Sequence, residues 1–476
     1  MTSKQLHVTM ISSPGIGHIL PVLLLAHRLA TRHNLRVTVL PVITTDGSPA
    51  VSQLLTSFTT TTKNLSIIQI PAADISAILP PEAKVVTHLC VMMRETIPAI
   101  RTAISTINPR PDVLIGDIFS TESWVVAEEL SIPKYVFVTS NAWFTALFAY
   151  SPVLDKQVSG QYVDQKMLLD IPGCKPVSPD DVIDPMLDRE DETYKVYLNQ
   201  AIGVTLSDGV LINTWEDLEP RSLDALRNNE ILQSVLKNKP VYTVGPIHKR
   251  YEPDVLKNDI IEWLDKQPEQ SVVYVSFGSG GTISVEQTEE LAWGLELSRQ
   301  RFIWVVRPPT GKHSDGSFLR ASESSHGLYA YLPEGFLART VEVGFVVPSW
   351  GPQVEILNHI SVGGFFTHCG WNSTLESVTS GIPMISWPLY AEQKMNATML
   401  ADELKVAVKP KVWPTRKVVG RDEVARMVTG LVAGEVGKEM KVKVKRLKED
   451  AQKALCENGS SYISICKFVE DCWSRI

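Results

Sequence analysis

The sequence predicts an α/β protein that contains two successive, doubly wound parallel sheets. Short apolar runs alternate with segments of helical length and periodicity, which is the pattern of parallel strands joined by covering helices. The same alternation restarts near the middle of the 476-residue chain. A chain of this length is long enough for two domains, each with its own hydrophobic core.

The first half begins with a buried strand and continues in strand and helix pairs. It ends with a strand that finishes at Gly245, and the polar, irregular stretch Pro246–Asp254 follows. We therefore place a first domain at 1–245 and a linker at 246–255. The expected strands of this half are 6–12, 36–42, 113–117 and 134–139, and the expected helices are 18–32 and 122–130.

The second half repeats the pattern and forms an expected domain at 256–455. Pro308 and Pro309 stop a strand because neither residue can donate a ladder hydrogen bond, and we expect a long surface loop over 308–332. The last stretch, 456–476, is predicted to be an apolar-faced helix that packs back on the first domain. The expected strands are 272–277 and 302–307, and the expected helices are 259–266 and 285–299.

Composition and charge exclude several classes of function. The net charge of −7 and the pI near 5.9 argue against nucleic acid as a partner, since binding to a phosphate backbone needs a dense basic surface. No stretch is apolar and long enough for stable membrane insertion, and the N-terminus lacks a secretory pattern. Six scattered cysteines suggest reduced thiols. We expect a cytoplasmic monomer.

Two polar residues are predicted to meet at the edge of the first sheet. His18 closes the turn Ser13–His18 after the first strand, and Asp117 ends another strand of the same sheet. Ligands of open α/β sheets bind outside the carboxyl ends of strands, and a carboxylate beside an imidazole orients it for proton transfer. The alternative for His18 is an exposed histidine in a purely structural turn, and the alternative for Asp117 is a helix cap. The full dinucleotide-binding fingerprint is absent from the turn.

Two loops of the second half have the features of anion sites. The loop Phe277–Thr282 follows a strand, is rich in glycine, and lacks the lysine of a P-loop; its alternative is a flexible turn. The segment Thr367–Thr374 joins an apolar strand to a helix through small residues, which directs backbone N–H groups and the helix dipole at one spot. Cys369 has no partners for a catalytic triad, and no metal-ligand spacing occurs.

Glu376 allows two interpretations. Ser373 and Glu376 have the Ser-x-x-Glu spacing of a capping box, so the carboxylate would merely cap a helix. Alternatively, the carboxylate accepts hydrogen bonds from a ribose diol.

The stretch Trp350–Gln393 resembles, nearly end to end, the signature box of plant UDP-sugar-dependent small-molecule glycosyltransferases. The resemblance extends over essentially the whole chain, including the Gly-Ile-Gly-His turn and the Phe-Gly-Ser loop. It implies the GT-B fold, which has two facing Rossmann-like domains and a C-terminal helix that crosses back to the first. The acceptor is then expected in the first domain and the UDP-sugar mainly in the second.

The resemblance also implies a role for each matching residue. His18 is the base and Asp117 its partner. An acceptor pocket would include Gly17, Phe119, Trp143 and Phe148. The alternative for the three aromatic residues is that they belong to the ordinary hydrophobic core. The donor residues are Trp350 on uracil, Gly351 and Gln353 at its edge, Glu376 on the ribose, Ser279, His368, Asn372 and Ser373 on the diphosphate, and Trp371, Glu392 and Gln393 at the sugar.

Two positions depart from the family pattern. Gly351 stands where alanine is usual, which matters little if only its backbone contacts uracil. Glu392 replaces the commoner aspartate, while Gln393 usually accompanies glucose.

The expected reaction is therefore inverting transfer of glucose from UDP-glucose to a hydroxyl of a small phenol. The phenol would be of hydroquinone, stilbene, monolignol or flavonoid type, the product a β-O-glucoside, and neither metal nor cofactor would be needed. The alternatives are a UDP-sugar epimerase or hydrolase of the same fold and a non-catalytic UDP-sugar-binding or small-molecule-binding protein.

Overall fold

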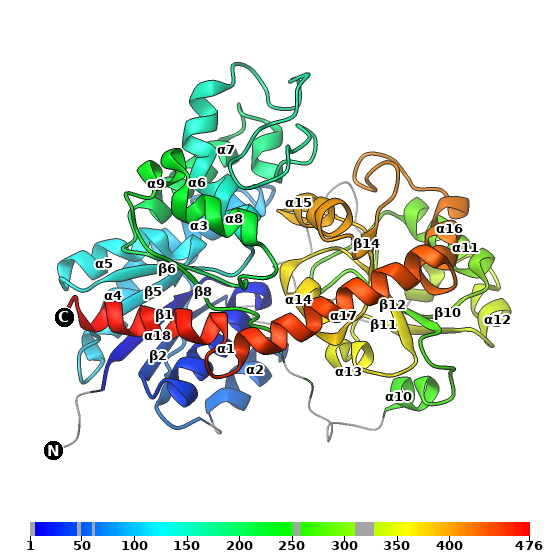
Figure 1. The fold of residues 1–476 in the computed structure, drawn as a ribbon, viewed down its shortest axis with the longest axis horizontal. Coiled ribbons are helices and arrows are strands. Elements are labelled where there is room, and N and C mark those ends of the chain that lie inside the picture. The colour runs from blue at the N-terminus through cyan, green and yellow to red at the C-terminus, as the bar shows by residue number, and fades with distance from the viewer. Residues whose placement is uncertain (1–4, 45–48, 60–61, 250, 252–257, 310–327) are drawn as a thin grey trace. The chain divides into compact units, whose positions relative to one another are not determined.

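A computed structural model describes residues 5–44, 49–59, 62–249, 251, 258–309 and 328–476. The chain divides into two compact units: Met1–His248 with Lys453–Ile476, and Lys249–Gln452 (Figure 1). Much of the expected linker at 246–255 and most of the expected loop at 308–332 lie outside the described residues.

The first unit contains a parallel sheet of eight strands in the order β3-β2-β1-β5-β6-β7-β8, with β4 also paired to β2. The strands β1 and β5 are buried along their whole length, as expected when helices cover both faces of a parallel sheet. The strands are β1 (His7–Ser12), β2 (Arg36–Ile43), β3 (Leu65–Ile67), β4 (Ile70–Pro71), β5 (Val113–Asp117), β6 (Lys134–Val138), β7 (Val210–Ile212) and β8 (Val241–Thr243).

Helices connect these strands. The α1 helix is amphipathic, and its apolar face, with Leu23 and Ala26, lies in the main core of the unit. The helices are α1 (Ile16–Arg32), α2 (Pro49–Thr59), α3 (Val85–Glu95), α4 (Ile97–Thr106), α5 (Trp124–Glu129), α6 (Ala142–Gln157), α7 (Glu192–Thr205), α8 (Pro220–Asn228) and α9 (Glu230–Val235), with short 3₁₀ turns η1 (Ile118–Ser123) and η2 (Asp184–Leu187).

The second unit contains a parallel sheet of six strands in the order β11-β10-β9-β12-β13-β14. Its elements are β9 (Val272–Ser276), β10 (Arg301–Val306), β11 (Gly344–Pro348), β12 (Val362–Thr367), β13 (Met384–Ser386), β14 (Ala407–Val408), α10 (Asp259–Leu264), α11 (Val285–Ser298), η3 (Leu328–Tyr331), α12 (Phe336–Thr340), α13 (Gln353–Leu357), α14 (Trp371–Ser380), α15 (Gln393–Thr398), the π-helical turn η4 (Met399–Glu403), α16 (Arg421–Val432) and α17 (Glu435–Leu455).

Each sheet has a point where the strand order reverses. In the first sheet the chain runs outward from β1 to one edge and resumes on the other side at β5; in the second sheet β9 and β12 have this relation. Open α/β sheets bind ligands at this point, outside the carboxyl ends of the two strands. The predicted fold class, with two doubly wound parallel sheets, is confirmed.

The last helix, α18 (Ser460–Trp473), packs within the first unit although the second unit precedes it in the sequence (Figure 1, red). The ring of Phe468 meets the ring of Tyr135 edge-on at 5.0 Å between centroids and that of Tyr242 at 5.5 Å. The hydroxyl of Tyr242 donates a hydrogen bond of 2.6 Å to Asp471. The expected return of the C-terminal helix is therefore present. None of the helices described has both the length and the apolar character to cross a membrane.

Candidate functional site

An imidazole and a carboxylate meet at the reversal point of the first sheet. Gly15 has a φ of 102°, which favours glycine, and α1 begins directly after it, so that His18 lies in the first turn of the helix. Nδ1 of His18 lies 3.2 Å from Oδ2 of Asp117, the last residue of β5. Nδ1 has no hydrogen bond of good geometry to any described residue, so this contact is electrostatic. Two strand-end residues that are distant in sequence are thus brought together.

Asp117 is held rigidly by four donors. Its Oδ2 accepts hydrogen bonds from the backbone N–H and the hydroxyl of Ser13, at 2.8 and 2.5 Å. Its Oδ1 accepts hydrogen bonds from the hydroxyl of Ser120 and the N–H of Phe119, at 2.6 and 3.2 Å. Burial acts to raise the pKa of Asp117, but His18 and the two serine hydroxyls outweigh it and hold that pKa below its ordinary value. The carboxylate is therefore ionised at neutral pH.

Asp117 caps a helical turn and also lies beside His18. Its Oδ1 caps η1, and its Oδ2 faces the histidine. One carboxylate can do both because each oxygen has more than one acceptor site.

The expected acceptor residues fall into two groups. The ring of Phe119 meets the His18 ring edge-on, with 5.1 Å between centroids, and a Cβ added to Gly17 would have no neighbour within 4 Å. Trp143 and Phe148 lie on α6 with exposed fractions of 1% and 3%. The structure thus places Phe119 at the imidazole, whereas Trp143 and Phe148 have the burial of core residues.

Two glycine loops enclose His368 at the reversal point of the second sheet. Gly278, in the loop after β9, has a φ of 75°. A Cβ on Gly278 or on Gly370 would lie 2.5 Å from a ring atom of His368. The loops after β9 and β12 are therefore packed against one imidazole, and only glycine fits at either position.

His368 is a neutral imidazole. Burial, with a smaller contribution from the positive charge of Arg307, lowers its pKa to about 4. Its Nδ1 is buried and has no hydrogen-bond partner among the described residues. After Cys369 and Gly370, α14 begins at Trp371, and the N-terminal N–H groups and the dipole of this helix favour an anion.

Gln353, Ser373 and Glu376 form a hydrogen-bonded group. The amide of Gln353, at the start of α13, donates to the hydroxyl of Ser373 at 2.8 Å and to Oε2 of Glu376 at 2.7 Å. Burial raises the pKa of Glu376 to about 7, although the Gln353 amide acts to lower it. The capping-box interpretation is wrong, because α14 begins at Trp371 after Gly370, and no side chain caps it.

The remaining donor positions lie on the neighbouring loops. Trp350 follows β11 and is 67% exposed, so its ring is open to a stacking partner. Glu392 is the N-cap residue of α15 and Gln393 is its first residue. The Gln393 side-chain oxygen accepts hydrogen bonds from the N–H groups of Leu389 and Tyr390 at 2.8 and 3.1 Å.

Asn396 connects α15 to one of these loops. Its amide donates to the carbonyl of Cys369 at 2.9 Å, which joins α15 to the loop after β12. Burial raises the pKa of the Cys369 thiol to about 12, so that a thiolate nucleophile is absent at neutral pH.

The sequence did not single out Ser13, Ser120 or Arg307. Ser13 and Ser120 fix Asp117, and Arg307, directly after β10, donates to the carbonyl of Ser279. The rule used for His18 and Asp117, that polar residues at carboxyl ends of parallel strands deserve scrutiny, would have found Ser13 and Arg307. No group of three or more His, Cys, Asp or Glu side chains in the described residues is placed to hold a metal ion.

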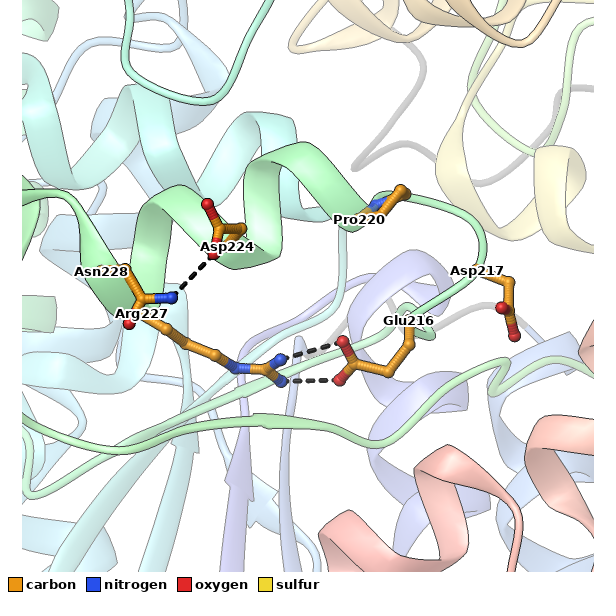
Figure 2. A pocket seen from close by; sticks show the side chains of 6 residues that line it. All are labelled: Glu216, Asp217, Pro220, Asp224, Arg227 and Asn228. Carbon is orange, nitrogen blue, oxygen red and sulfur yellow. Dashed lines mark hydrogen bonds and ion pairs between the residues drawn. The ribbon is translucent and has the colours of Figure 1, made fainter.

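A separate pocket of about 430 Å³ lies in the first unit beside α8 (Figure 2). Its charged groups pair largely with one another: Arg227 contacts both carboxylate oxygens of Glu216, and Asn228 donates to Asp224. Its full lining is Glu216, Asp217, Pro220, Asp224, Arg227 and Asn228. None of the predicted site residues lines it, so we assign it no role.

Comparison with known proteins identifies clear relatives. Residues 233–452 match the family model "UDP-glucoronosyl and UDP-glucosyl transferase". The chain is 50% identical over 456 residues to anthocyanidin 3-O-glucosyltransferase 5 of Manihot esculenta, covering 96% of this chain and 93% of that protein. It is 41% identical over 458 residues to hydroquinone glucosyltransferase of Rauvolfia serpentina, covering 96% and 95%.

A solved structure agrees over the whole chain. UGT2 of Phytolacca americana, complexed with UDP-2fluoro-glucose and pterostilbene, matches with a TM-score of 0.87 and 37% identity. The match covers 99% of this chain and 100% of that one.

Proposed function

The chain belongs to the family of UDP-glucoronosyl and UDP-glucosyl transferases, and on that premise we propose that it transfers glucose from UDP-glucose to a hydroxyl of a small phenol. The protein is an enzyme, a UDP-sugar-dependent glycosyltransferase. The observation that supports transfer to a phenol is the His18–Asp117 pair at the reversal point of the first sheet. A phenol is a weak nucleophile until a base takes its proton, and this pair supplies a base.

In the proposed mechanism, His18 accepts the proton of the phenol as its oxygen attacks the anomeric carbon. The bond between that carbon and the diphosphate oxygen breaks on the opposite face, so an α-linked sugar gives a β-glucoside. The Asp117 carboxylate stabilises the imidazolium that forms, as a charge 3.2 Å from Nδ1 does. In our proposal, Gly17 and Phe119 are the acceptor-binding residues nearest this base. Trp143 and Phe148, which are buried on α6, would support the wall of the acceptor pocket.

The donor is proposed to bind the second unit. Trp350 stacks on uracil, and the backbone around Gly351 and Gln353 contacts the edge of the uracil ring. The carboxylate of Glu376 accepts hydrogen bonds from the ribose hydroxyls. The diphosphate gains charge as it leaves, and the helix N-terminus after His368 stabilises it. The full proposed donor set is Ser279, Trp350, Gly351, Gln353, His368, Trp371, Asn372, Ser373, Glu376, Glu392 and Gln393.

The names of the relatives support a phenolic acceptor. One relative is named for anthocyanidin, another for hydroquinone, and the solved neighbour holds the stilbene pterostilbene. We propose an acceptor of this chemical class for the present enzyme.

An acceptor screen tests the proposal. The purified chain is incubated with UDP-glucose and a panel of hydroquinone, stilbene, monolignol and flavonoid aglycones, and the products are identified by mass spectrometry, with the anomeric configuration by NMR. A phenol β-O-glucoside with release of UDP is the expected result. Glucose released from donor alone, without any glucoside, would instead show a hydrolase, and UDP-sugar binding without turnover on any acceptor would show a binding protein.

We further propose that the enzyme acts as a cytoplasmic monomer. Reducing conditions keep cysteines such as the exposed Cys456 as thiols. A fluorescent fusion and light scattering of the purified chain test these two points.

A further inference from the structure

Arg307 lies among the loops that form the candidate diphosphate site. It directly follows β10, the neighbour of β9 in the sheet, so its backbone stands at the same carboxyl edge as the loop after β9. Its Nη1 donates a hydrogen bond to the carbonyl of Ser279 in that loop. Its charge also contributes to the low pKa of His368, which places the guanidinium near the loop after β12. One cation therefore contacts the loop after β9 and acts electrostatically on His368 in the loop after β12.

The guanidinium of Arg307 has no counter-ion within the described residues. Its Nε is buried and has no hydrogen-bond partner there. Burial lowers the pKa of Arg307, and the groups that act against burial are the hydroxyls of Tyr274 and Tyr390 rather than carboxylates. An arginine stays protonated nonetheless.

Two other arginines of the same unit are paired with carboxylates. Arg339 contacts both carboxylate oxygens of Glu296, and Arg421 contacts both of Glu290. Partial burial of a cation without an anion is unfavourable, and binding of an anion from outside would offset that cost.

Resting on the function proposed above, we propose that Arg307 binds the diphosphate of the donor and stabilises the charge of the leaving UDP. The anomeric C–O bond breaks with its electron pair on the β-phosphate oxygen, the phenol oxygen forms the new bond, and His18 takes the phenolic proton. The guanidinium keeps its own proton throughout and only offsets the negative charge. A forked donor suits phosphate oxygens, and Nη2 can turn to the phosphate while Nη1 holds the Ser279 carbonyl.

The test compares ligands with and without phosphate. Isothermal titration measures the affinity of Arg307→Gln and wild type for UDP and for uridine. We expect Arg307→Gln to lose about tenfold or more in UDP affinity, the scale of a charge-assisted hydrogen bond, while uridine affinity stays unchanged. The loss should shrink as salt is added to the buffer, because wild-type binding of UDP weakens more with ionic strength when one more cation contributes.

A matched control lies at the other end of the same strand. Arg301 begins β10 and donates to the side-chain oxygen of Gln267 at 3.0 Å. Arg301→Gln should keep the wild-type ratio of UDP to uridine affinity. An Arg307→Gln protein with the wild-type ratio and salt dependence overturns the proposal.

A structural role for Arg307 gives a different result. If the residue merely holds the Ser279 loop, the salt dependence of UDP binding does not change in Arg307→Gln, and this outcome also overturns the proposal. If Arg307→Gln fails to fold, Arg307→Lys decides: selective weakening of UDP supports the proposal, and equal weakening of both ligands refutes it. Failure of wild type to bind UDP would instead overturn the proposed function itself.

Discussion

At the residue scale, the structure shows how one buried carboxylate serves two purposes. Sequence alone left Asp117 as either a helix cap or a partner of His18, and its two oxygens perform one task each. The choice was not visible in the sequence because it depends on Ser13 and Ser120, which fix the orientation of the carboxylate through tertiary hydrogen bonds. Arg307 was missed because its surroundings come from three separate strand ends.

The first prediction concerns His18. Replacing it with alanine removes the base, so transfer to phenols of high pKa should fall about 100-fold or more, the typical contribution of general base catalysis. Affinity for UDP should not change. Initial rates with a series of phenols, together with UDP titration, measure this. Asp117→Asn is the companion variant and should reduce kcat less; a His18→Ala enzyme with normal turnover would refute the base assignment.

The second prediction concerns Glu376 and pH. We expect its ionised carboxylate to bind the ribose diol, so uridine affinity should rise as the pH increases through about 7 and level off above it. For a group with that pKa, binding at pH 6 should be about tenfold weaker than at pH 8. Uridine is the probe because it lacks phosphates that titrate in this range. A Glu376→Gln protein should bind uridine weakly and with a flat pH profile, whereas an unchanged profile would contradict the assignment.

The stability of the unliganded protein should change in the opposite direction. The folded-state pKa of Glu376 is raised from 4.5 to about 7, so the folded state binds more protons in that window than the unfolded state. The contribution of this group is most favourable below about pH 4.5 and is lost as the pH rises through 7. Glu376→Gln should therefore be more stable than wild type at pH 8, by up to about 3 kcal/mol. Denaturant unfolding at pH 5 and pH 8 measures the difference.

At the element scale, the sites depend on where strands end. The prediction of a strand at 113–117 agrees with β5, and the apolar runs at 6–12 and 272–277 correspond to β1 and β9. The helical stretch predicted at 122–130 is present as α5, and the 3₁₀ turn η1 precedes it because the Asp117 cap starts a turn directly after the strand. Two- and three-residue strands such as β4 and β13 are too short to show a period in the sequence.

The third prediction tests the packing of the two loops in the second unit. A methyl group at Gly278 would lie 2.5 Å from the His368 ring, and the φ of 75° adds backbone strain. Gly278→Ala should displace the imidazole and weaken UDP binding about tenfold or more, since charge-assisted hydrogen bonds to the diphosphate would be lost. Gly430→Ala, where a Cβ meets nothing within 4 Å, is the matched control. Equal UDP affinity of the two variants would show that close packing of Gly278 against the His368 ring is not needed for UDP binding.

The fourth prediction concerns the start of α14. The N–H groups of this helix and the guanidinium of Arg307 are positive groups built into the chain, and we propose that they offset the charge that a divalent ion would otherwise neutralise. Transfer rates should thus be unchanged by EDTA. Strong inhibition that Mg²⁺ or Mn²⁺ reverses would contradict this.

At the scale of the whole molecule, each unit holds one of the two candidate sites. The candidate base lies in the first unit and the candidate donor groups lie in the second. The sequence predicted two separate units because the pattern of strands and helices restarts near the middle of the chain. The return of α18 also followed from its apolar face, but the choice of Tyr135 and Tyr242 as neighbours depends on tertiary packing.

The fifth prediction tests this division by hydrogen exchange. UDP should slow exchange in peptides that cover 277–282 and 367–376, and a phenolic acceptor should slow it at 13–18 and 117–120. Peptides from α18 serve as the internal control and should be unaffected by UDP. Protection of 13–18 by UDP, without protection of 367–376, would refute the division of roles.

The packing of α18 also has a consequence for synthesis on the ribosome. Ile465, Phe468 and Cys472 belong to the main core of the first unit, together with residues as early as Leu6. Because translation proceeds from the N-terminus, the entire second unit leaves the ribosome before that core receives its final residues. The half made first is thus the half completed last, and a chain that stops prematurely leaves Tyr135 and Tyr242 uncovered for chaperones to recognise.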